Sequence, residues 1–581
     1  MARKTTRANP KKSQPKYTVK KTEDVYVVMP DGVRISCCIW QPDSDGQFPT
    51  LFASSPYQWE YDDVPAYTLF PWRETGPIEW YVERGYAYVH ADVRGSGRSE
   101  GEFRFLSKEE QSDNCQLIQW VAKQPWSDGK IGGVGQSYFA FSQWLMGVNR
   151  PPNLTCIAPY DALVDPYRDH GYHGGIYCQY RTNWYTSVRR NALHRPANSR
   201  RGKIMEYDLG LALTSHETYD DWWKERTAFE RIENIDIPVL SIGHWAKVGL
   251  HHRGNLVAFE YLKTKNKKLV MTNFKTAADV HHAFDTIEFH DEFLLPFYDR
   301  YLKGFDNGYD SEPPVRLYVN GAEEWRAEKQ WPLRQARYQP YYLHTGPSES
   351  VTSINDGAMS TTARPRSRGS TSYNYPDPKW RNGVVAIGPN CMDPVRRVLT
   401  FTTDPLKEDV EIIGPIVLEL YASSTCTDTD FIVKLADQAP QTAEERDKGI
   451  NPPFVNVAKG WLKASHHTTK NEAMSKPYRL FYDHDDPKPL VPGEIYKFEI
   501  EVHPAAHRFR AGNRIRLEIV NGDSQLTDRG WTHPYHPSKL GADTIVHNAR
   551  HPSRLLLPII PVATKRKRSS GKGKRSGGRK N

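Results

Sequence analysis

Residues 129–144 read GKIGGVGQSYFAFSQW, and they decide the fold more than any other stretch of the chain. The pattern over 130–134 predicts a short strand, and the residues from 138 onward favour a helix. Between them Gly135 precedes Ser137 by two positions, which is typical of a nucleophile elbow, a strained turn that holds a serine hydroxyl above a sheet. Phe139 stands where a second glycine is usual, so an ordinary strand-to-helix turn is the competing interpretation.

Short apolar segments alternate with helix-prone segments on both sides of this turn. Buried-strand patterns lie at 50–54, 86–92, 154–159, 238–242 and 268–272, and helix patterns at 78–84 and 111–123. This alternation predicts a parallel sheet covered by helices on both faces. Residues 161–236 interrupt it and are rich in Tyr, Trp, Arg and His. We expect them to form a helical cap over the turn and to supply a substrate pocket, although most of the aromatic rings would only attach the cap.

From about residue 313 the chain changes to β patterns. Apolar and charged residues alternate over 496–502 and 515–519, as in antiparallel strands with one polar face. The predicted organisation is a disordered basic tail (1–21), an α/β catalytic domain (22–160 and 237–312), the helical cap (161–236), a C-terminal β-sandwich domain (313–562) and a second disordered basic tail (563–581).

The basic character of the chain belongs to its two ends. The net charge is +9, and residues 1–21 and 565–581 contribute 8 and 9 positive charges without an acid, which leaves the part between them at −8. Such tails are expected to be disordered. We expect one of three roles for them: a solubilising end, a nuclear localisation signal, or a segment that binds nucleic acid weakly.

Composition also excludes several classes of protein. No run of about 18 apolar residues occurs, so we expect no membrane span, and the N-terminus lacks the apolar region of a secretory signal. Seven scattered cysteines favour reduced thiols and a cytoplasmic setting. No C-x-x-C or H-E-x-x-H pattern occurs, and neither a metal nor an organic cofactor is predicted.

Several segments carry a family resemblance by their order and spacing. They are DGVRISCCIWQPD at 31–43, SSPYQWEY at 54–61, HADVRGSGRSEGEF at 90–103, PWSDGKIG at 125–132, PYRDHGYHGG at 166–175 and YDRYLKG at 298–304. The chain resembles the α/β-hydrolase family of cocaine esterase, glutaryl acylase, α-amino-acid ester hydrolase and X-prolyl dipeptidyl peptidase (the CocE/NonD-type hydrolases) from about residue 24 to 560. The resemblance implies an α/β-hydrolase fold with a helical cap, followed by a jelly-roll-like β-sandwich.

The resemblance also implies a function and several site residues. It implies a serine hydrolase that cleaves an ester or amide acyl bond of a small molecule through an acyl-enzyme on Ser137. In this family a tyrosine commonly follows the serine and the second glycine is often missing, so Phe139 fits. The hydroxyl of Tyr57 and the backbone N–H of Tyr138 match the oxyanion hole, which must already point at the developing charge. The type of acyl and leaving group and any homo-oligomer stay open.

The remaining triad positions depart from the family. The resemblance places the acid where Lys247 stands and the histidine where Thr276 stands, and a lysine cannot accept a hydrogen bond from a histidine. In one interpretation the triad is rearranged: His281 or His282 is the base, and Asp161, after the sixth strand, is the acid. Relatives with an L-H-x-R-G-N segment, as at 250–255 here, often carry an acid at the place of Asp161.

In the other interpretation the fold is kept and the hydrolytic chemistry is lost. The protein would then bind a ligand, or position one for another reaction, and the paired histidines His251–His252 and His281–His282 would be surface residues. A third hypothesis is a nucleic-acid-associated protein that acts through its tails. Two tests distinguish the three hypotheses. They are labelling of Ser137 by a fluorophosphonate probe, and salt-sensitive nucleic-acid binding that depends on the tails.

Overall fold

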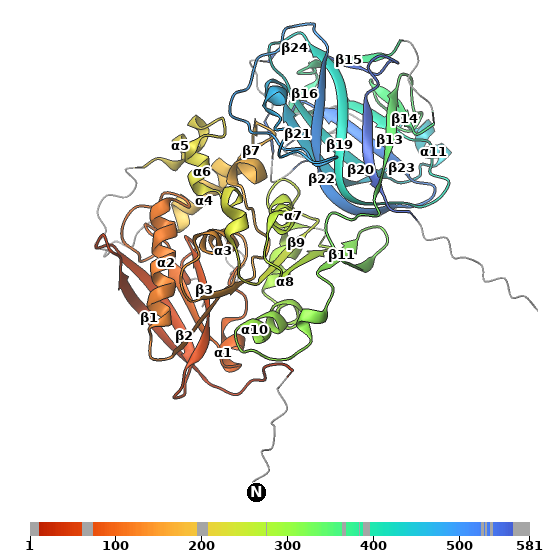
Figure 1. The fold of residues 1–581 in the computed structure, drawn as a ribbon. Coiled ribbons are helices and arrows are strands. Elements are labelled where there is room, and N and C mark those ends of the chain that lie inside the picture. The colour runs from red at the N-terminus through yellow and green to blue at the C-terminus, as the bar shows by residue number, and fades with distance from the viewer. Residues whose placement is uncertain are drawn as a thin grey trace, which may run out of the picture.

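The computed structural model describes residues 11–60, 74–193, 207–274, 276–362, 368–382, 384–386, 395–524, 528, 532–534 and 539–561. Two lobes follow one another along the chain, an N-terminal lobe of mixed sheet and helices and a C-terminal lobe made almost wholly of strands (Figure 1). No helix in these ranges is long and apolar enough to cross a membrane.

A ten-stranded sheet forms the centre of the N-terminal lobe, in the order β1-β2-β4-β3-β5-β6-β9-β10-β11-β12. Its strands are β1 (Val19–Val28), β2 (Arg34–Pro42), β3 (Phe48–Ser55), β4 (Ala87–Asp92), β5 (Ser127–Gly133), β6 (Leu154–Ile157), β9 (Val239–His244), β10 (Lys267–Thr272), β11 (Val315–Val319) and β12 (Glu324–Glu328). The strands from β4 to β11 run parallel. Every residue of β3, β4 and β9 is buried, as expected for parallel strands covered on both faces.

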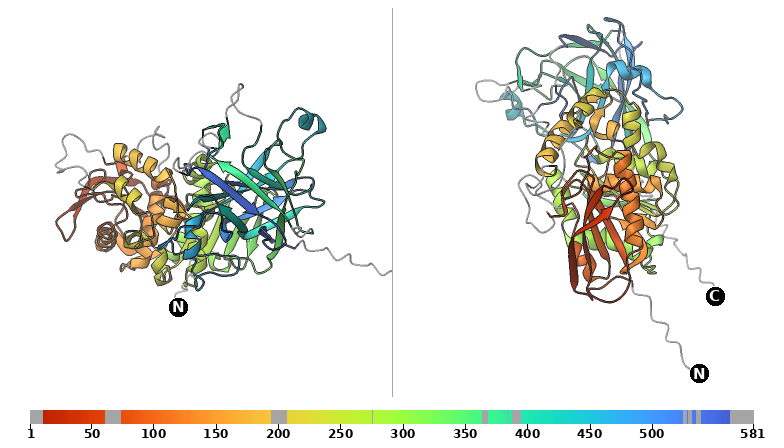
Figure 2. Two further views of the ribbon diagram at one scale, coloured as in Figure 1. Left: turned by 90° about the horizontal axis from the view of Figure 1, so that it is seen from above. Right: turned by 90° about the vertical axis from the view of Figure 1, so that its left-hand side faces the viewer.

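Helices cover both faces of this sheet (Figure 2). They are α1 (Ile78–Glu83), α2 (Lys108–Ala122), α3 (Tyr138–Asn149), α7 (His252–Tyr261), α8 (Ala277–Phe284), α9 (Ile287–Phe289) and α10 (Leu295–Tyr301). The predicted cap lies between β6 and β9 and contains the two-residue strands β7 (Tyr172–His173) and β8 (Ile176–Tyr177) with helices α4 (Tyr180–Asn191), α5 (Leu209–Ser215) and α6 (Asp221–Arg226). In Figure 1 these helices stand at the end of the lobe that meets the C-terminal strands.

The C-terminal lobe is an eleven-stranded sheet that closes on itself, because β25 pairs with both β13 and β19. Its strands are β13 (Arg337–His344), β14 (Asp356–Ser360), β15 (Ser370–Tyr375), β18 (Leu399–Thr402), β19 (Val410–Ser424), β20 (Asp430–Gln438), β21 (Phe454–Lys463), β22 (Tyr496–Phe509), β23 (Arg514–Val520), β24 (Gly541–Val546) and β25 (Arg554–Ile559). A small hairpin, β16 (Trp380–Asn382) and β17 (Val385–Ala386), and the helix α11 (Ala443–Asp447) are attached to it. The alternating apolar residues of β22 and β23 fill its core.

The boundary between the two lobes lies later than the sequence indicated. Residues from 313 were expected to begin the sandwich, but β11 pairs in parallel with β10, and β12 pairs with β11. The change from one sheet to the other therefore falls between Glu328 and Arg337. A strand of alternating apolar residues suits the edge of either sheet, so its pattern could not assign it.

The N-terminal tail is shorter than expected. Residues 1–10 and 562–581 lie outside the described part, but residues 11–21, predicted to be disordered, are ordered against the body. The backbone N–H of Ser13 donates to the buried carboxylate of Asp299 at 2.7 Å, and the ring of Tyr17 contacts Phe48 edge-on at 5.3 Å. β1 already begins at Val19. Hydrogen bonds and a single aromatic ring hold this segment on the body, so a search for runs of apolar residues missed it.

Candidate active site

Ser137 stands on a strained turn between β5 and α3, where the sequence predicts a nucleophile elbow. Its backbone has φ 58° and ψ −118°, and α3 begins at the next residue. Residues other than glycine rarely adopt this region, so the surrounding chain must hold the turn. Gly135 is required because its φ is +119° and a Cβ there would lie 2.4 Å from the Cβ of Phe139. The helix N-terminus behind Ser137 favours negative charge that develops beside it.

Tyr57, just after β3, lies beside this turn. Its ring centroid is 6.3 Å from that of Tyr138 and 6.1 Å from that of Phe139. The cap reaches the same place, because Trp184 of α4 donates its Nε1–H to the Tyr57 hydroxyl oxygen at 2.9 Å. Burial raises the pKa of Tyr57 well above its ordinary value, so the hydroxyl keeps its proton and can donate it to an oxyanion.

Tyr138 offers its backbone rather than its side chain to the site. As the first residue of α3, its N–H has no acceptor within the helix. Its hydroxyl points elsewhere and donates to the carboxylate of Glu110, with oxygen distances of 2.9 and 3.0 Å. The structure brings the ring of Tyr57 against the start of α3, where the N–H of Tyr138 projects, and their role as an oxyanion hole stays a prediction.

Asp161 is the centre of a fully buried charge cluster that follows β6. One carboxylate oxygen accepts from His244 Nε2 at 2.6 Å and from His251 Nδ1 at 2.7 Å. The other accepts from Gln136 Nε2 at 2.8 Å and from the Lys247 ammonium. Burial by itself would raise the pKa of Asp161, but the neighbouring histidines and lysine hold it well below its ordinary value. The carboxylate is therefore charged, and Lys247 supplies its counter-charge.

The expected hydrogen bond between Asp161 and His281 or His282 is absent, and Lys247 stands between the acid and His281. The Lys247 ammonium contacts Asp161 and lies 2.9 Å from His281 Nε2. The other ring nitrogen of His281 lies 3.4 Å from a carboxylate oxygen of Glu74. Burial raises the pKa of Glu74 well above its ordinary value. A long lysine side chain at the usual acid position thus fills the space that a histidine–aspartate pair would need.

His282 and Thr276 have positions that explain the departure from the family pattern. His282 is exposed, since adjacent residues of a helix point about 100° apart and His281 takes the inward direction. Thr276 caps α8: its hydroxyl oxygen accepts from the N–H of Asp279 at 3.2 Å, and Asp279 returns a bond to the Thr276 N–H. The usual histidine position therefore begins a helix here.

His251 is a candidate that the sequence reasoning missed. It follows β9 at the start of α7, and its Nδ1 donates to Asp161 as the histidine of a triad donates to its acid. Its ring contacts Phe141 edge-on at 5.1 Å, one turn of α3 beyond Ser137. Burial, partly offset by Asp161, lowers the pKa of His251 to about 4, so the ring is neutral at pH 7. The signal was present in the L-H-x-R-G-N segment, together with an acid after β6.

The Ser137 hydroxyl itself has no base in contact. Among the residues that the structure describes, no side chain forms a hydrogen bond to the Ser137 oxygen, while the backbone N–H donates to Tyr160 at 3.2 Å. Catalytic hydrogen bonds are often long before substrate binds. The structure nonetheless supplies a strained serine whose neighbour Gln136 bonds to Asp161, the acid of a buried acid–histidine pair with His251.

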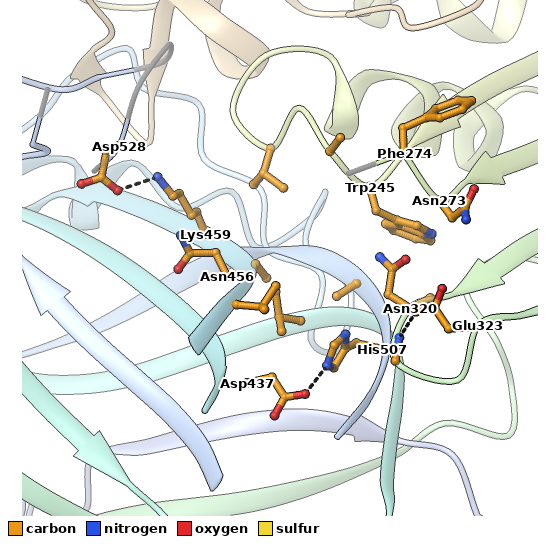
Figure 3. Close-up of a pocket in the computed structure, with 18 residues that line it drawn as sticks. Trp245, Asn273, Phe274, Asn320, Glu323, Asp437, Asn456, Lys459, His507 and Asp528 are labelled. Carbon is orange, nitrogen blue, oxygen red and sulfur yellow. Dashed lines mark hydrogen bonds and ion pairs between the residues drawn. The ribbon is translucent and has the colours of Figure 1, made fainter. Parts of the chain in front are cut away.

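A cavity of about 660 Å³ lies between the two lobes, beside this cluster (Figure 3). Trp245, Asn320 and His507 line it, together with residues of β21 and β22, and Ser137 is not among the lining residues. The loop after β9 separates the two places, because Trp245 and its neighbours face the cavity while Lys247 reaches Asp161. The cavity is therefore distinct from the chemistry at Ser137.

Comparison with known proteins identifies both lobes. Residues 31–275 match X-Pro dipeptidyl-peptidase (S15 family), and residues 307–556 match the X-Pro dipeptidyl-peptidase C-terminal non-catalytic domain. Cocaine esterase of Rhodococcus is 26% identical over 92% of this chain and 98% of its own. The crystal structure of a CocE/NonD family hydrolase from Staphylococcus aureus matches with a TM-score of 0.76 and 23% identity, over 94% of this chain and 97% of that one. An α-amino acid ester hydrolase matches with a TM-score of 0.70 and 21% identity, over 96% and 99%. The expected α/β-hydrolase fold with a C-terminal β-domain is confirmed.

Proposed function

The chain belongs to the α/β-hydrolase family that contains the X-Pro dipeptidyl peptidases and cocaine esterase, a family of serine hydrolases, and we propose that it cleaves an ester or amide acyl bond through an acyl-enzyme on Ser137. One observation carries the proposal. Ser137 is held in a strained conformation immediately before α3, and the ring of Tyr57, whose hydroxyl is held protonated, packs against Tyr138, the residue that follows the serine. Such strain is retained where it serves a function.

The first step is attack of the Ser137 oxygen on the carbonyl carbon of the substrate. The serine proton passes to a base, and negative charge develops on the carbonyl oxygen. The Tyr57 hydroxyl and the Tyr138 N–H donate to that oxygen, where such donors contribute most. Collapse expels the alcohol or amine, which takes the proton from the base. Water, deprotonated by the same base, then releases the acid from Ser137.

We assign the base to His251, with Asp161 as its orienting acid. Because Nδ1 donates its proton to Asp161, Nε2 carries the lone pair that a base needs. His281 is the rival base, but its Nε2 faces the Lys247 ammonium, which opposes the gain of a second positive charge. Lys247 neutralises Asp161 while the histidines are neutral, so it stabilises the resting cluster.

The substrate is proposed to be a small acyl ester or amide that enters between the elbow and the cap. α4 delivers Trp184 to the Tyr57 hydroxyl, and the ring of Trp184 stacks with that of Tyr138 at 6.1 Å. The guanidinium of Arg181, one turn earlier on α4, lies 5.3 Å from the Trp184 ring and is buried. Flat aromatic surfaces with few polar groups favour an apolar acyl or leaving group.

A ligand-binding protein with degenerate chemistry is the second candidate function. It is favoured by the replacement of the usual acid and histidine by Lys247 and Thr276, and by the missing hydrogen bond to the Ser137 hydroxyl. Under this candidate the cluster around Asp161 would serve only the stability of the fold. Substrate analogues would then bind without turnover.

Fluorophosphonate labelling of the full chain separates the two candidates. We expect the wild type and Ser215→Ala, a control serine in the cap, to be labelled on Ser137, and Ser137→Ala to be unlabelled. His251→Ala should slow labelling far more than His281→Ala. A folded wild type that does not react with the probe supports the binding protein. The reverse order of the two histidine variants moves the base to His281.

A further inference from the structure

Three side chains that can ligate a metal meet where the cap touches the C-terminal lobe. They are His173 at the end of β7, Cys178 just after β8, and His533, which lies between β23 and β24. One ligand atom of each lies within 4.8 Å of the others, and all three residues are buried. His533 is 360 residues away from His173 in sequence, so no spacing motif revealed the cluster. This cluster lies outside the proposed catalytic machinery.

The hydrogen bonds of the two histidines leave a lone pair on each of the two ring nitrogens that face each other. His173 Nε2 lies 2.9 Å from the backbone oxygen of Asp169, and a carbonyl oxygen accepts only. His533 Nδ1 lies 2.7 Å from a carboxylate oxygen of Asp523, which also pairs with the Lys434 ammonium at 3.1 Å, and a carboxylate accepts only. Each neutral ring therefore uses its one N–H outward. Two lone pairs, on His173 Nδ1 and His533 Nε2, then face each other at 2.8 Å.

Such a contact needs a positive charge between the two nitrogens. A proton on one of the rings is one solution. A metal ion is the other solution. Outward bonds from ligating histidines to a carboxylate and to a backbone carbonyl are the usual support around a metal, because they set the tautomer and the ring direction.

Cys178 supplies the third and most selective donor. A bound cation favours the thiolate form of a coordinating cysteine, and the backbone N–H of Tyr180 is already directed at this sulfur. The ring of Trp461 stacks on His173 at 4.5 Å and fixes it from one side. Lys434 lies 3.1 Å from Asp523 and anchors the outer carboxylate.

We propose that His173, Cys178 and His533 bind a zinc ion. Imidazole and thiolate donors are those that zinc prefers, with Zn–N distances of about 2.0–2.1 Å. Tetrahedral geometry places two such nitrogens about 3.3 Å apart, half an ångström wider than here, and the fourth position is left for water. The thiolate and the nearby Asp523 carboxylate offset part of the charge of Zn²⁺, and Asp523 also pairs with Lys434.

The zinc ion would connect the cap to the C-terminal lobe. Cys178 stands two residues before α4, and the neighbouring Gln179 N–H already donates to the backbone oxygen of Thr532 at 2.9 Å. α4 carries Trp184, which bonds to the Tyr57 hydroxyl. Occupancy of the site would therefore fix the helix that sets the proposed oxyanion hole, and its role is structural rather than chemical.

Metal analysis of the full chain, purified without a histidine tag from zinc-supplemented medium, tests this directly. We expect about one equivalent of zinc per chain in the wild type and in the controls Cys115→Ser and His467→Ala. His533→Ala and Cys178→Ser should each retain less than about a tenth of it. A folded wild type that takes up no zinc, or ligand variants that keep it, would overturn the proposal.

Two measurements keep the test decisive if a ligand variant fails to fold. Cobalt added to metal-stripped wild type should give a thiolate-to-cobalt charge-transfer band, which Cys115→Ser retains. Zinc, but not magnesium, should raise the Tm of the stripped wild type by roughly a few degrees. Absence of both effects contradicts the site. Both readouts are independent of turnover, so they stand whether or not Ser137 proves to be a nucleophile.

Discussion

Two buried aspartate–histidine pairs in this molecule have almost the same local geometry and different surroundings. His251 Nδ1 donates to Asp161 at 2.7 Å, and His533 Nδ1 donates to Asp523 at 2.7 Å. Each carboxylate also contacts a lysine. What differs is the group near the second ring nitrogen. The first ring packs against Phe141, one turn of α3 beyond Ser137, whereas the second faces His173 and lies near Cys178.

An acid–histidine pair therefore has no function of its own. The acid sets the tautomer and leaves a lone pair on the far nitrogen. A serine within reach makes that lone pair a base, and a second histidine with a cysteine makes it a ligand. The proposal for each site therefore rests on the group that faces the second ring nitrogen of its histidine. Each experiment should change one pair at a time.

The largest expected difference comes from deleting the two rings. His251→Ala should lower turnover by about 10⁴–10⁶, because loss of the base removes the function of the whole triad. His533→Ala should remove bound zinc and lower turnover much less. Steady-state kinetics and metal analysis on both variants check this, with His467→Ala as the control. Equal losses of turnover would show that the two pairs are not functionally distinct.

Replacing the acids should separate the pairs at the next level. Asp161→Asn is expected to lower turnover by about 10⁴, since it leaves the geometry and mis-sets the histidine tautomer. Asp523→Asn should weaken zinc binding by about 10–100-fold, the usual effect of losing an outer carboxylate. Competition with a chelator measures the second effect. A change of less than tenfold in turnover for Asp161→Asn would favour the degenerate hydrolase.

The oxyanion hole gives a smaller effect that belongs to the first site. Tyr57→Phe should lower turnover by about 10²–10³, and substrate binding much less, because the hydroxyl acts on transition-state charge. Trp184→Phe, which removes only the bond that orients Tyr57, should cost less than Tyr57→Phe. An equal rise in KM and fall in kcat/KM, with kcat unchanged, would instead assign Tyr57 to binding.

Acid should destabilise the fold through the first pair. The pKa of His251 is lowered to about 4 from 6.5, so the unfolded chain binds a proton that the folded chain refuses. The contribution of His251 to the free energy of unfolding is fully present above pH 6.5 and is lost as the pH falls toward 4. Between pH 7 and pH 5 this group should lower the free energy of unfolding by roughly 2 kcal/mol. His251→Gln should remove this pH-dependent contribution. Urea unfolding at the two pH values measures it. An unchanged pH dependence would mean that the ring is not a buried neutral histidine.

The smallest expected effect lies far from both pairs. Deletion of residues 1–10 should leave the Tm unchanged, whereas deletion of 1–18 removes Ser13 and Tyr17 and should lower it by roughly a few degrees. Turnover at low temperature and zinc content should be the same in both. Equal melting temperatures would show that residues 11–18 contribute nothing to stability.

The predictable part of the molecule is the part that is encoded locally. The turn around Ser137, the parallel strands and the cap segment follow from contiguous residues, since glycine placement and apolar runs act over a few positions. The partners of Asp161 could not be derived in this way. Lys247 and His251 lie in the loop after β9 and His281 lies in α8, and which of them reaches a carboxylate depends on side-chain length and on where α8 begins. His173 and His533 meet only when both lobes are in place.

The bond between the Gln179 N–H and the Thr532 carbonyl bears on the order in which the protein matures during synthesis. Domains commonly fold as they leave the ribosome, N-terminal first. The sheet, the elbow and Ser137 would be complete while most of the C-terminal lobe was still to be made. Until residues near 532 emerged, the start of α4 would bond only within the N-terminal lobe, as Arg181 does to His170. A nascent chain therefore completes the turn that carries the proposed nucleophile well before it completes the support that the C-terminal lobe gives to α4 and Trp184.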